Sequence, residues 1–170
     1  MQYITTYHSP LGPMLLAADN LGLTGAWFQG EKFYAHSLDP VHETGETPAL
    51  SAARAWLDIY FSGREPDFTP PLHMTGTPFQ MEVWALLRQI PYGRTTTYGQ
   101  IASQIAQARG LPRMSAQAVG GAVGHNEISV IVPCHRVIGA NNSLTGYAGG
   151  LDKKSALLKL EGAYPWKAEK

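Results

Sequence analysis

The first part of the chain alternates between short apolar segments and residues typical of turns. The apolar or β-rich segments span residues 3–7, 13–18 and 23–28. Ser9–Gly12 and Asp19–Gly22 separate them and carry the Pro, Gly, Asp and Asn residues that tight turns favour. This alternation predicts a small antiparallel sheet, whereas residues 29–46 show no clear period.

A helical period replaces the alternation after residue 46. The apolar stripe consists of Leu50, Ala53, Leu57, Tyr60 and Phe61. Thr47 can cap this helix, Pro48 suits its first position, and Gly63 stands where a C-terminal glycine belongs. Residues 64–76 follow, with three prolines and a glycine, and this composition predicts a linker.

Four further helices are predicted beyond the linker, and the first three of them follow one another closely. Thr77 and Gln80 have the spacing of a capping box and open the first of them. The next is expected from about Gly99 to Ala108. Ser115 can then cap a helix from Ala116 to about Gly124. A helix, a short break and a second helix form the outline of a helix-turn-helix.

The last third of the chain begins with a β-branched run at residues 128–132, which predicts a short buried strand. A loop rich in Gly and Asn occupies residues 139–150. The final helix is expected from about Lys153 to Glu161, with Asp152 as its cap and Gly162 as its stop.

These elements predict an α/β (α+β) fold in two domains. Residues 1–76 would form an N-terminal domain with a small antiparallel sheet and a helix. Residues 77–170 would form a mainly helical C-terminal domain that contains the helix-turn-helix. A length of 170 residues is sufficient for two small domains with real cores.

Charge is distributed unevenly along a chain whose formal net charge is zero. Residues 1–76 hold three basic and eight acidic residues, and residues 77–170 hold ten basic and five acidic ones. A basic half on a neutral chain favours contact with a polyanion, although chance segregation of surface charge would give the same numbers.

The chain has one cysteine and therefore no internal disulfide, which fits a reducing, cytoplasmic environment. The longest apolar runs are too short to cross a bilayer, and the first residues lack the pattern of a signal peptide. Neither a membrane nor a secretory route is expected.

The single cysteine, Cys134, has two interpretations. A free cysteine is most often a small buried hydrophobe. The adjacent His135 suggests a nucleophile, because a thiol becomes reactive when a base removes its proton. Side chains of adjacent residues point apart in helices and strands, so the pair requires an irregular backbone or a bridging water. Pro133 is consistent with an irregular backbone.

Glu161 occupies the last turn of the final helix, where a negative charge opposes the helix dipole. A carboxylate that holds the second ring nitrogen of His135 would complete a Cys–His–Glu triad. A solvated glutamate at a frayed helix end is the alternative.

The segment 116–124 is a helix of very small residues, and its three glycines weaken it by about 1 kcal/mol each relative to alanine. Small side chains permit close approach of another surface. That surface could be a neighbouring helix or a DNA groove, and nearby arginines favour DNA.

Several ordered motifs resemble the O6-alkylguanine-DNA alkyltransferases. Ile131–Val137 contains the Pro-Cys-His-Arg-Val signature of that family. The match extends through Thr77–Trp84, Tyr98–Ala102, Ala118–Asn126, Gly146–Gly150 and Leu157–Gly162. The resemblance is good from about residue 77 to 163 and loose over residues 1–76, where it implies a ribonuclease H-like scaffold domain.

The resemblance implies a role for each matching residue. Cys134 would attack the alkyl carbon, His135 would take the thiol proton through a water, and Glu161 would orient His135. Asn126 would brace the turn before the active site, and Tyr98 would press on the target phosphate and donate to the departing base. The residues implied in binding the flipped base or the DNA are Gln117, Ala118, Gly120, Gly121, Arg136, Val137, Tyr147 and Ala148.

Two positions depart from the family pattern. Gln117 stands where the family often has the arginine that fills the gap left by the flipped base, so we expect somewhat lower DNA affinity. Glu127 follows Asn126 where proline is usual, which would bring an acidic group near the DNA and loosen the hinge. The loop 106–114 is also longer than in some members.

The sequence therefore predicts a monomeric DNA-repair enzyme that acts once on double-stranded DNA containing alkylated bases. It would move an alkyl group from O6-alkylguanine, with O4-alkylthymine open as a second substrate, onto Cys134. No cofactor or metal is expected, because the histidines lack ligand spacing. The alternatives are a protein that binds alkylated DNA without repairing it, which Cys134 argues against, and a cysteine hydrolase.

Overall fold

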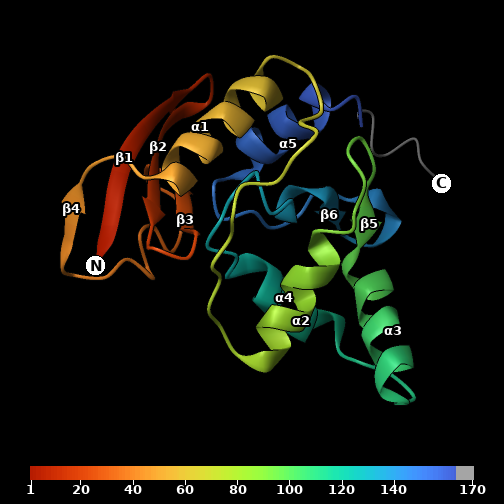
Figure 1. The fold of residues 1–170 in the computed structure, drawn as a ribbon. Helices are drawn as coiled ribbons and strands as arrows, with labels where there is room; N and C mark the ends of the chain where they lie inside the picture. Colours follow the sequence, from red (N-terminus) through yellow and green to blue (C-terminus); the bar gives the residue numbers. More distant parts are fainter. Residues whose placement is uncertain (164–170) are drawn as a thin grey trace. The chain divides into compact units, whose positions relative to one another are not determined.

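The structure is a computed structural model that describes residues 1–163. Figure 1 shows the order of its elements. The strands are β1 (Gln2–Ser9), β2 (Gly12–Ala18), β3 (Leu23–Phe28), β4 (His42–Thr44), β5 (Thr96–Thr97) and β6 (Val137–Ile138). The α-helices are α1 (Pro48–Phe61), α2 (Pro78–Leu87), α3 (Tyr98–Arg109), α4 (Ala116–Gly124) and α5 (Leu151–Leu160). Two 3₁₀ turns, η1 (Cys134–Arg136) and η2 (Ala140–Asn142), lie between α4 and α5.

The described chain divides into two compact units. The first consists of Met1–Thr75 together with Glu127–Ile131, and the second of Gly76–Asn126 with the residues from Val132 onward. The short segment 127–131 thus packs with the first unit although both of its flanks belong to the second. The last seven residues of the predicted C-terminal domain lie outside the described residues. No helix within residues 1–163 is long and apolar enough to span a membrane.

The first unit is built on a four-stranded sheet with the order β3-β2-β1-β4. β1, β2 and β3 pair antiparallel, as the alternation predicts. A fourth strand, β4, was not predicted, and it pairs parallel to β1. This strand is three exposed residues long in a stretch without a period, so it left no hydrophobic signal.

Helix α1 packs on this sheet (Figure 1), and Leu50, Ala53, Leu57 and Tyr60 of its predicted stripe are buried. Thr47 accepts a hydrogen bond from the Leu50 amide, and Gly63 has a φ of 89°, which a glycine adopts without strain. The core that the helix and sheet share contains Met14, Leu16, Leu23, Phe28, Leu50, Leu57 and Tyr60.

The second unit carries the helix-turn-helix. Capping boxes open α2 at Thr77 and α3 at Thr97, and the hydroxyl of Ser115 caps α4. Gly110 ends α3 with a φ of 67°. Helix α4 packs on both α2 and α3, and the indole of Trp84 donates to a backbone carbonyl of α4 over 2.9 Å.

Two local predictions in the last third of the chain were wrong. Residues 128–132 do not form a strand: only Ile128 makes a bridge, and Val130 turns the backbone with a φ of 73°. The run is apolar because it is buried, and burial alone does not specify an extended backbone. Helix α5 begins one residue before Asp152, after Gly150, and no side chain caps it.

Candidate active site

The backbone around Cys134 is irregular, as an adjacent cysteine–histidine pair requires. Pro133 leads into η1 with a φ of −83° and a ψ of 64°. The Cys134 amide donates to the Val132 carbonyl over 2.8 Å, and the Arg136 amide donates to the Pro133 carbonyl over 3.1 Å. This tight turn buries Cys134, which is 6% exposed as a residue.

His135 and Glu161 form a buried pair. The distance between Nε2 of His135 and Oε2 of Glu161 is 2.6 Å, and both side chains are inaccessible to solvent. Burial lowers the pKa of His135 below its usual value and outweighs the hydrogen bond and charge of Glu161, which raise it. A neutral ring that donates from Nε2 leaves Nδ1 as its basic nitrogen.

Glu161 stays ionised because several donors surround it. Arg136 donates to it from Nε over 2.8 Å and from Nη2 over 3.2 Å, and the Gly93 amide donates over 3.0 Å. Burial raises the pKa of Glu161, but the hydrogen bonds and charges of His135 and Arg136 outweigh burial and lower it to about 2. The unfavourable place of this carboxylate at a helix end is thereby compensated locally.

Arg136, which the resemblance assigns to binding the flipped base or the DNA, makes its hydrogen bonds inside the second unit. Its guanidinium is committed to Glu161 and to the Ile90 carbonyl, which accepts from Nη1 over 2.7 Å. The side chain is 9% exposed. Arginine is suited to this site because its planar fork satisfies a carboxylate bidentately while staying charged.

Asn126 is buried and bonds the backbone on the other side of the inserted segment 127–131. Its Nδ2 donates to the Val132 carbonyl over 2.9 Å. The amide thus joins the end of α4 to the chain two residues before Cys134, which is the bracing geometry that the resemblance implies.

Tyr98 is the first residue of α3, and its hydroxyl donates to the Thr145 carbonyl over 3.3 Å. Burial raises the pKa of Tyr98, and the charge of Cys134 raises it further. The phenol therefore keeps its proton at neutral pH and can donate it.

A hollow of about 540 Å³ lies beside Tyr98 in the second unit. Its lining includes three predicted residues, Tyr98, Gln117 and Gly120, together with Thr145 and Gly146 of the Gly-rich loop. Cys134 does not line it. Tyr147 and Ala148 follow the lining residues in the same loop and are half-buried, and Val137 is fully buried with its carbonyl bonded to Lys154.

The glycines of α4 face open space. A side-chain carbon added at Gly121 or Gly124 would meet no atom within 4 Å, and at Gly120 only the Tyr98 ring at 3.8 Å. Gln117, Ala118 and Gly121 are exposed. Packing within the second unit therefore does not require a glycine at Gly121 or Gly124.

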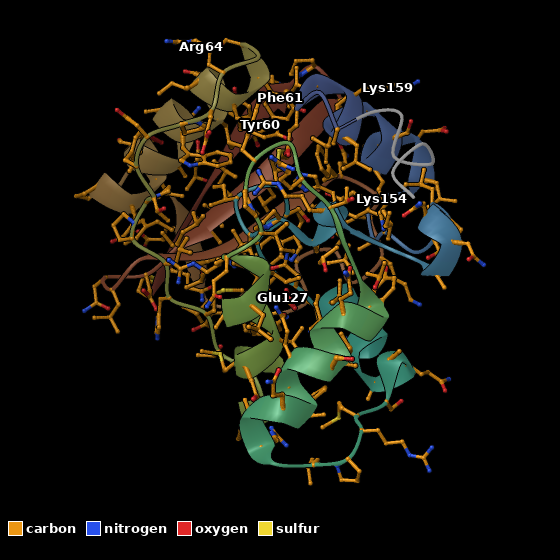
Figure 2. All side chains as sticks on the ribbon, turned by 90° about the vertical axis from the view of Figure 1, so that its right-hand side faces the viewer. Tyr60, Phe61, Arg64, Glu127, Lys154 and Lys159 are labelled. Atoms are coloured by element: carbon orange, nitrogen blue, oxygen red, sulfur yellow. The ribbon has the colours of Figure 1, made fainter. Side chains whose placement is uncertain are left out.

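Glu127, which the sequence predicts to bring an acidic group near the DNA, packs within the first unit. Its carboxylate accepts from the Trp27 indole over 2.9 Å and from the Ser37 hydroxyl over 3.2 Å, and it lies 3.3 Å from Nδ1 of His36. The residue is 8% exposed (labelled in Figure 2). These donors pair the negative charge of the Glu127 carboxylate, whose partners were not predicted from the sequence.

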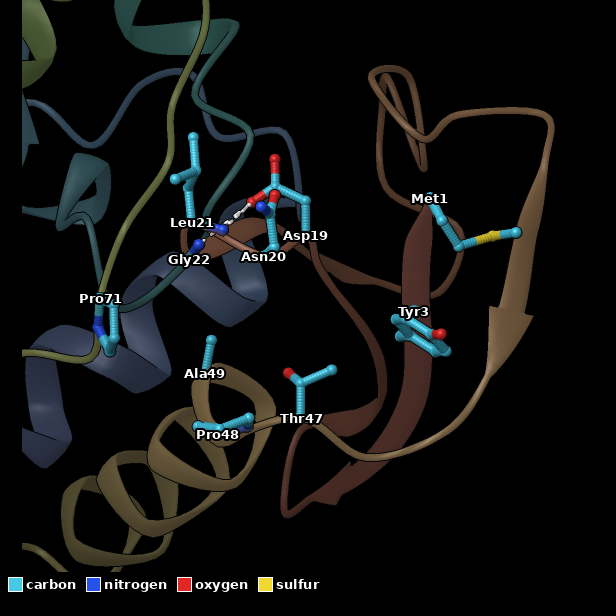
Figure 3. A pocket seen from close by; sticks show the side chains of 10 residues that line it. All are labelled: Met1, Tyr3, Asp19, Asn20, Leu21, Gly22, Thr47, Pro48, Ala49 and Pro71. Carbon is cyan, nitrogen blue, oxygen red and sulfur yellow. Dashed lines mark hydrogen bonds between the residues drawn. The ribbon is translucent and has the colours of Figure 1, made fainter.

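A second hollow, of about 650 Å³, lies in the first unit (Figure 3). Asp19 stands at its edge, where its carboxylate accepts from the Leu21 and Gly22 amides and pairs with His73. The rest of the lining is mostly apolar. None of the predicted site residues contributes to this hollow, so its size alone does not indicate a functional site.

Lys154, which was not predicted as a site residue, is fully buried in the first turn of α5. A signal was present, because Lys154 stands three and four residues before the buried Leu157 and Leu158 and seven before Glu161. A lysine on the apolar stripe of a helix is expected to have a specific partner.

The fold and these side chains define a two-unit helix-turn-helix protein with a buried Cys–His–Glu group in its second unit. The family described as 6-O-methylguanine DNA methyltransferase matches with its DNA binding domain over residues 78–163 and with its ribonuclease-like domain over residues 2–74. The chain belongs to this family.

Two relatives named methylated-DNA–protein-cysteine methyltransferase illustrate the similarity. The one from Mycobacterium tuberculosis is 47% identical over 161 residues, 95% of this chain and 93% of the relative. The one from Methanosarcina acetivorans is 47% identical over 161 residues, 95% of this chain and 99% of the relative. The crystal structure of M. tuberculosis OGT in complex with DNA has a TM-score of 0.81 and 43% identity, covering 95% of this chain and 93% of that one.

Proposed function

We propose that this protein repairs double-stranded DNA by a single, irreversible transfer of an alkyl group from O6-alkylguanine to Cys134. The observation that carries the proposal is the buried 2.6 Å hydrogen bond between His135 and Glu161. His135 directly follows Cys134, the only cysteine of the chain. Membership of the family and the similarity to an OGT that binds DNA support the same reaction.

His135 acts as the base in this proposal. Its neutral ring donates from Nε2 to Glu161, so Nδ1 takes the thiol proton through one water. Glu161 fixes the tautomer and stabilises the imidazolium that forms. The depressed pKa of His135 keeps the ring unprotonated, and therefore able to accept, at neutral pH.

The thiolate of Cys134 then attacks the alkyl carbon in line with the departing oxygen. The S–C bond forms, the C–O6 bond breaks, and its electron pair leaves with guanine. The Tyr98 hydroxyl donates a proton to the base as it leaves, and the proton that His135 took from the thiol returns through solvent to the phenolate that remains. The thioether offers no easy leaving path, so the protein is spent after one turnover.

The base must leave the helical stack to reach a buried thiol. The exposed residues of α4, including Ala118 and Gly121, would lie in the DNA groove, where their small size permits close approach. Gln117 would fill the space that the extruded base vacates, and Tyr147 with the backbone of Val137 and Ala148 would line the base pocket. Residues 1–76 would serve as the scaffold domain, with 77–170 holding the DNA-binding and active-site machinery.

We also propose that the protein acts as a monomer in the cytoplasm. The side chains invoked above all come from one chain. A reducing compartment keeps a lone nucleophilic thiol from oxidation.

Intact-mass spectrometry tests the proposed function. The protein is mixed with a duplex oligonucleotide containing O6-methylguanine, and we expect one methyl group on the Cys134 peptide. Cys134→Ala should bind the duplex but gain no mass, and removal of the lesion should stop. Tight binding with unchanged mass in the natural chain would instead identify a non-repairing damage-binding protein, and turnover of an ester or amide would identify a hydrolase.

A further inference from the structure

A further hollow of the second unit, of about 340 Å³, lies between α3 and the loop that leads to α4. Ser103, Ala106 and Gln107 of α3 line it, together with residues 111–114 of the loop. It shares no lining residue with the hollow beside Tyr98. Its volume is at the lower end of the usual size of ligand sites, about 300–1,000 Å³. The side chains that line it therefore indicate which class of ligand it would accept.

Three of the lining residues carry side-chain hydrogen-bond donors, and all three are exposed. Ser103 has a hydroxyl, Gln107 an amide and Arg113 a guanidinium. Ser103 and Gln107 stand four residues apart on α3, so they share one face of the helix. No acidic residue lines the hollow. A cation with neutral donors and no carboxylate is suited to an anion, and the planar fork of arginine matches a phosphate.

Arg113 has no internal partner for its charge. Within residues 1–163 its side chain makes no hydrogen bond, ion pair or ring contact. Arg109, four residues earlier, is by contrast bound to Glu82 and lies over the Phe79 ring, with a centroid 5.8 Å away. Of the two arginines beside the loop, only Arg113 is therefore available to a ligand.

The surrounding chain is basic over a long stretch. Between Glu82 and Glu127 the sequence contains four arginines and no acidic residue. Both of these carboxylates have donors elsewhere, Glu82 in Arg109 and Glu127 in Trp27. The stretch includes α3, the loop and the exposed face of α4. Its uncompensated positive charge favours the backbone of DNA over other anions of small size.

The loop also supplies a charge that α4 lacks. Gln117 stands where the resembled family often has an arginine, so the start of α4 carries no cation of its own. Arg113 lies four residues before Gln117, in the loop that is longer than in some members. A loop cation can bind a phosphate while the side chain at position 117 fills the duplex, so the two tasks fall to different residues.

We propose that Ser103, Gln107 and Arg113 form a binding site for one phosphate of the DNA backbone, separate from the site that receives the alkylated base. This inference rests on the proposed function, because DNA is the ligand in both. Arg113 donates to the phosphate oxygens and neutralises their charge, and Ser103 and Gln107 donate from α3. Such a contact holds the duplex in register against α4 and carries no base specificity.

The salt dependence of binding tests the charge of this site. Affinity for an undamaged duplex is measured by fluorescence anisotropy across salt concentrations. Each phosphate that the protein neutralises contributes about 0.9 to the slope of log affinity against log salt. Arg113→Gln should lose about 0.9 of slope, which is about an eightfold loss of affinity at 0.1 M salt relative to 1 M. Arg113→Lys should keep the slope, because it keeps the charge.

Arg88→Gln is the matched control. It removes an exposed arginine at the end of α2 that does not line the hollow, so it should retain the slope of the natural chain. An unchanged slope in Arg113→Gln, or an equal reduction in Arg88→Gln, overturns the proposal.

A second measurement locates the phosphate. Duplexes with O6-methylguanine carry one uncharged methylphosphonate at successive positions, and binding is measured in the Cys134→Ala background so that no alkyl group moves. At one position the substitution should weaken binding when Arg113 is present and have little effect in Arg113→Gln, because the two charges act as a pair. Ser103→Ala and Gln107→Ala should reduce the effect at the same position. If every position affects both proteins equally, Arg113 contacts no phosphate.

The two proposals fail separately. If Arg113→Gln shows the lower slope but the natural chain takes no methyl group from DNA, the proposed function fails while the phosphate site stands. If the methyl group reaches Cys134 and the slope is unchanged in Arg113→Gln, the phosphate site fails while the proposed function stands.

Discussion

Glu161 is the residue on which the buried polar group depends, because it accepts from a histidine, an arginine and a backbone amide at once. A carboxylate in this state cannot be protonated without loss of those bonds. Replacing it would leave Arg136 buried without its partner, and an unpaired buried charge is strongly destabilising. The hydrogen bonds of Glu161 therefore link the chemistry of the site to the stability of the second unit.

The depressed pKa of Glu161 predicts acid sensitivity. The folded-state pKa of about 2 lies below the ordinary 4.5, so the stabilisation is complete above about pH 4.5 and disappears as the pH falls toward 2. The full contribution is roughly 3 kcal/mol. Denaturant unfolding across this range should show the decline. Glu161→Gln should lower stability at neutral pH and flatten the profile, and a variant that keeps the slope of the natural chain would contradict the assignment.

At the scale of elements, α4 combines a weak helix with an open face. Glycine lowers helix propensity by about 1 kcal/mol relative to alanine, and nothing in the second unit occupies the space beside Gly121. Weak local propensity without an internal packing reason is typical of a surface shaped for an external partner.

Substitution at Gly121 separates these effects. Gly121→Ala should raise the free energy of unfolding by up to about 1 kcal/mol, because it reduces backbone freedom without a clash. DNA affinity should fall slightly in Gly121→Ala and strongly in Gly121→Leu, whose side chain would obstruct the groove. Thermal unfolding and fluorescence anisotropy with a duplex oligonucleotide measure the two quantities. Undiminished affinity in Gly121→Leu would remove this face from the DNA interface.

At the scale of the whole molecule, the chain leaves the second unit after Asn126 and returns at Val132. Within this segment, residues 127–131, the buried carboxylate of Glu127 accepts hydrogen bonds from the first unit and serves as a polar anchor there. The Ser129 hydroxyl donates to the Glu31 carboxylate over 3.2 Å. The first unit therefore includes residues that lie in the sequence between α4 and η1.

Removal of this anchor should destabilise the protein without touching DNA binding. Glu127→Ala leaves the buried indole of Trp27 without its acceptor, so we expect a loss of about 1–3 kcal/mol in the free energy of unfolding. Glu43→Ala, on the exposed β4, is the matched control and should have little effect. Tighter DNA binding by Glu127→Ala, but not by Glu43→Ala, would show that Glu127 does repel DNA.

The sequence by itself determined the elements whose signals are local. Helix caps at Thr47, Thr77 and Ser115 were predicted correctly because a capping hydroxyl bonds an amide three residues away. The fold class, the family and the pairing of His135 with Glu161 were also predictable. The ordered motifs, and a negative charge at the C-terminal end of a helix, can be recognised from the sequence alone.

Tertiary structure alone decided where the long-range polar partners lie. Arg136 donates to Glu161 inside the second unit, and Glu127 accepts from donors about a hundred residues away in the sequence. Lys154 donates to three carbonyls that lie outside its own helix. A buried charge is satisfied by whichever donors or acceptors the fold brings to it, and neither spacing nor propensity encodes that choice. The apolar run 128–132 turned instead of extending for a related reason, because hydrophobicity specifies burial and leaves the backbone path to the packing around it.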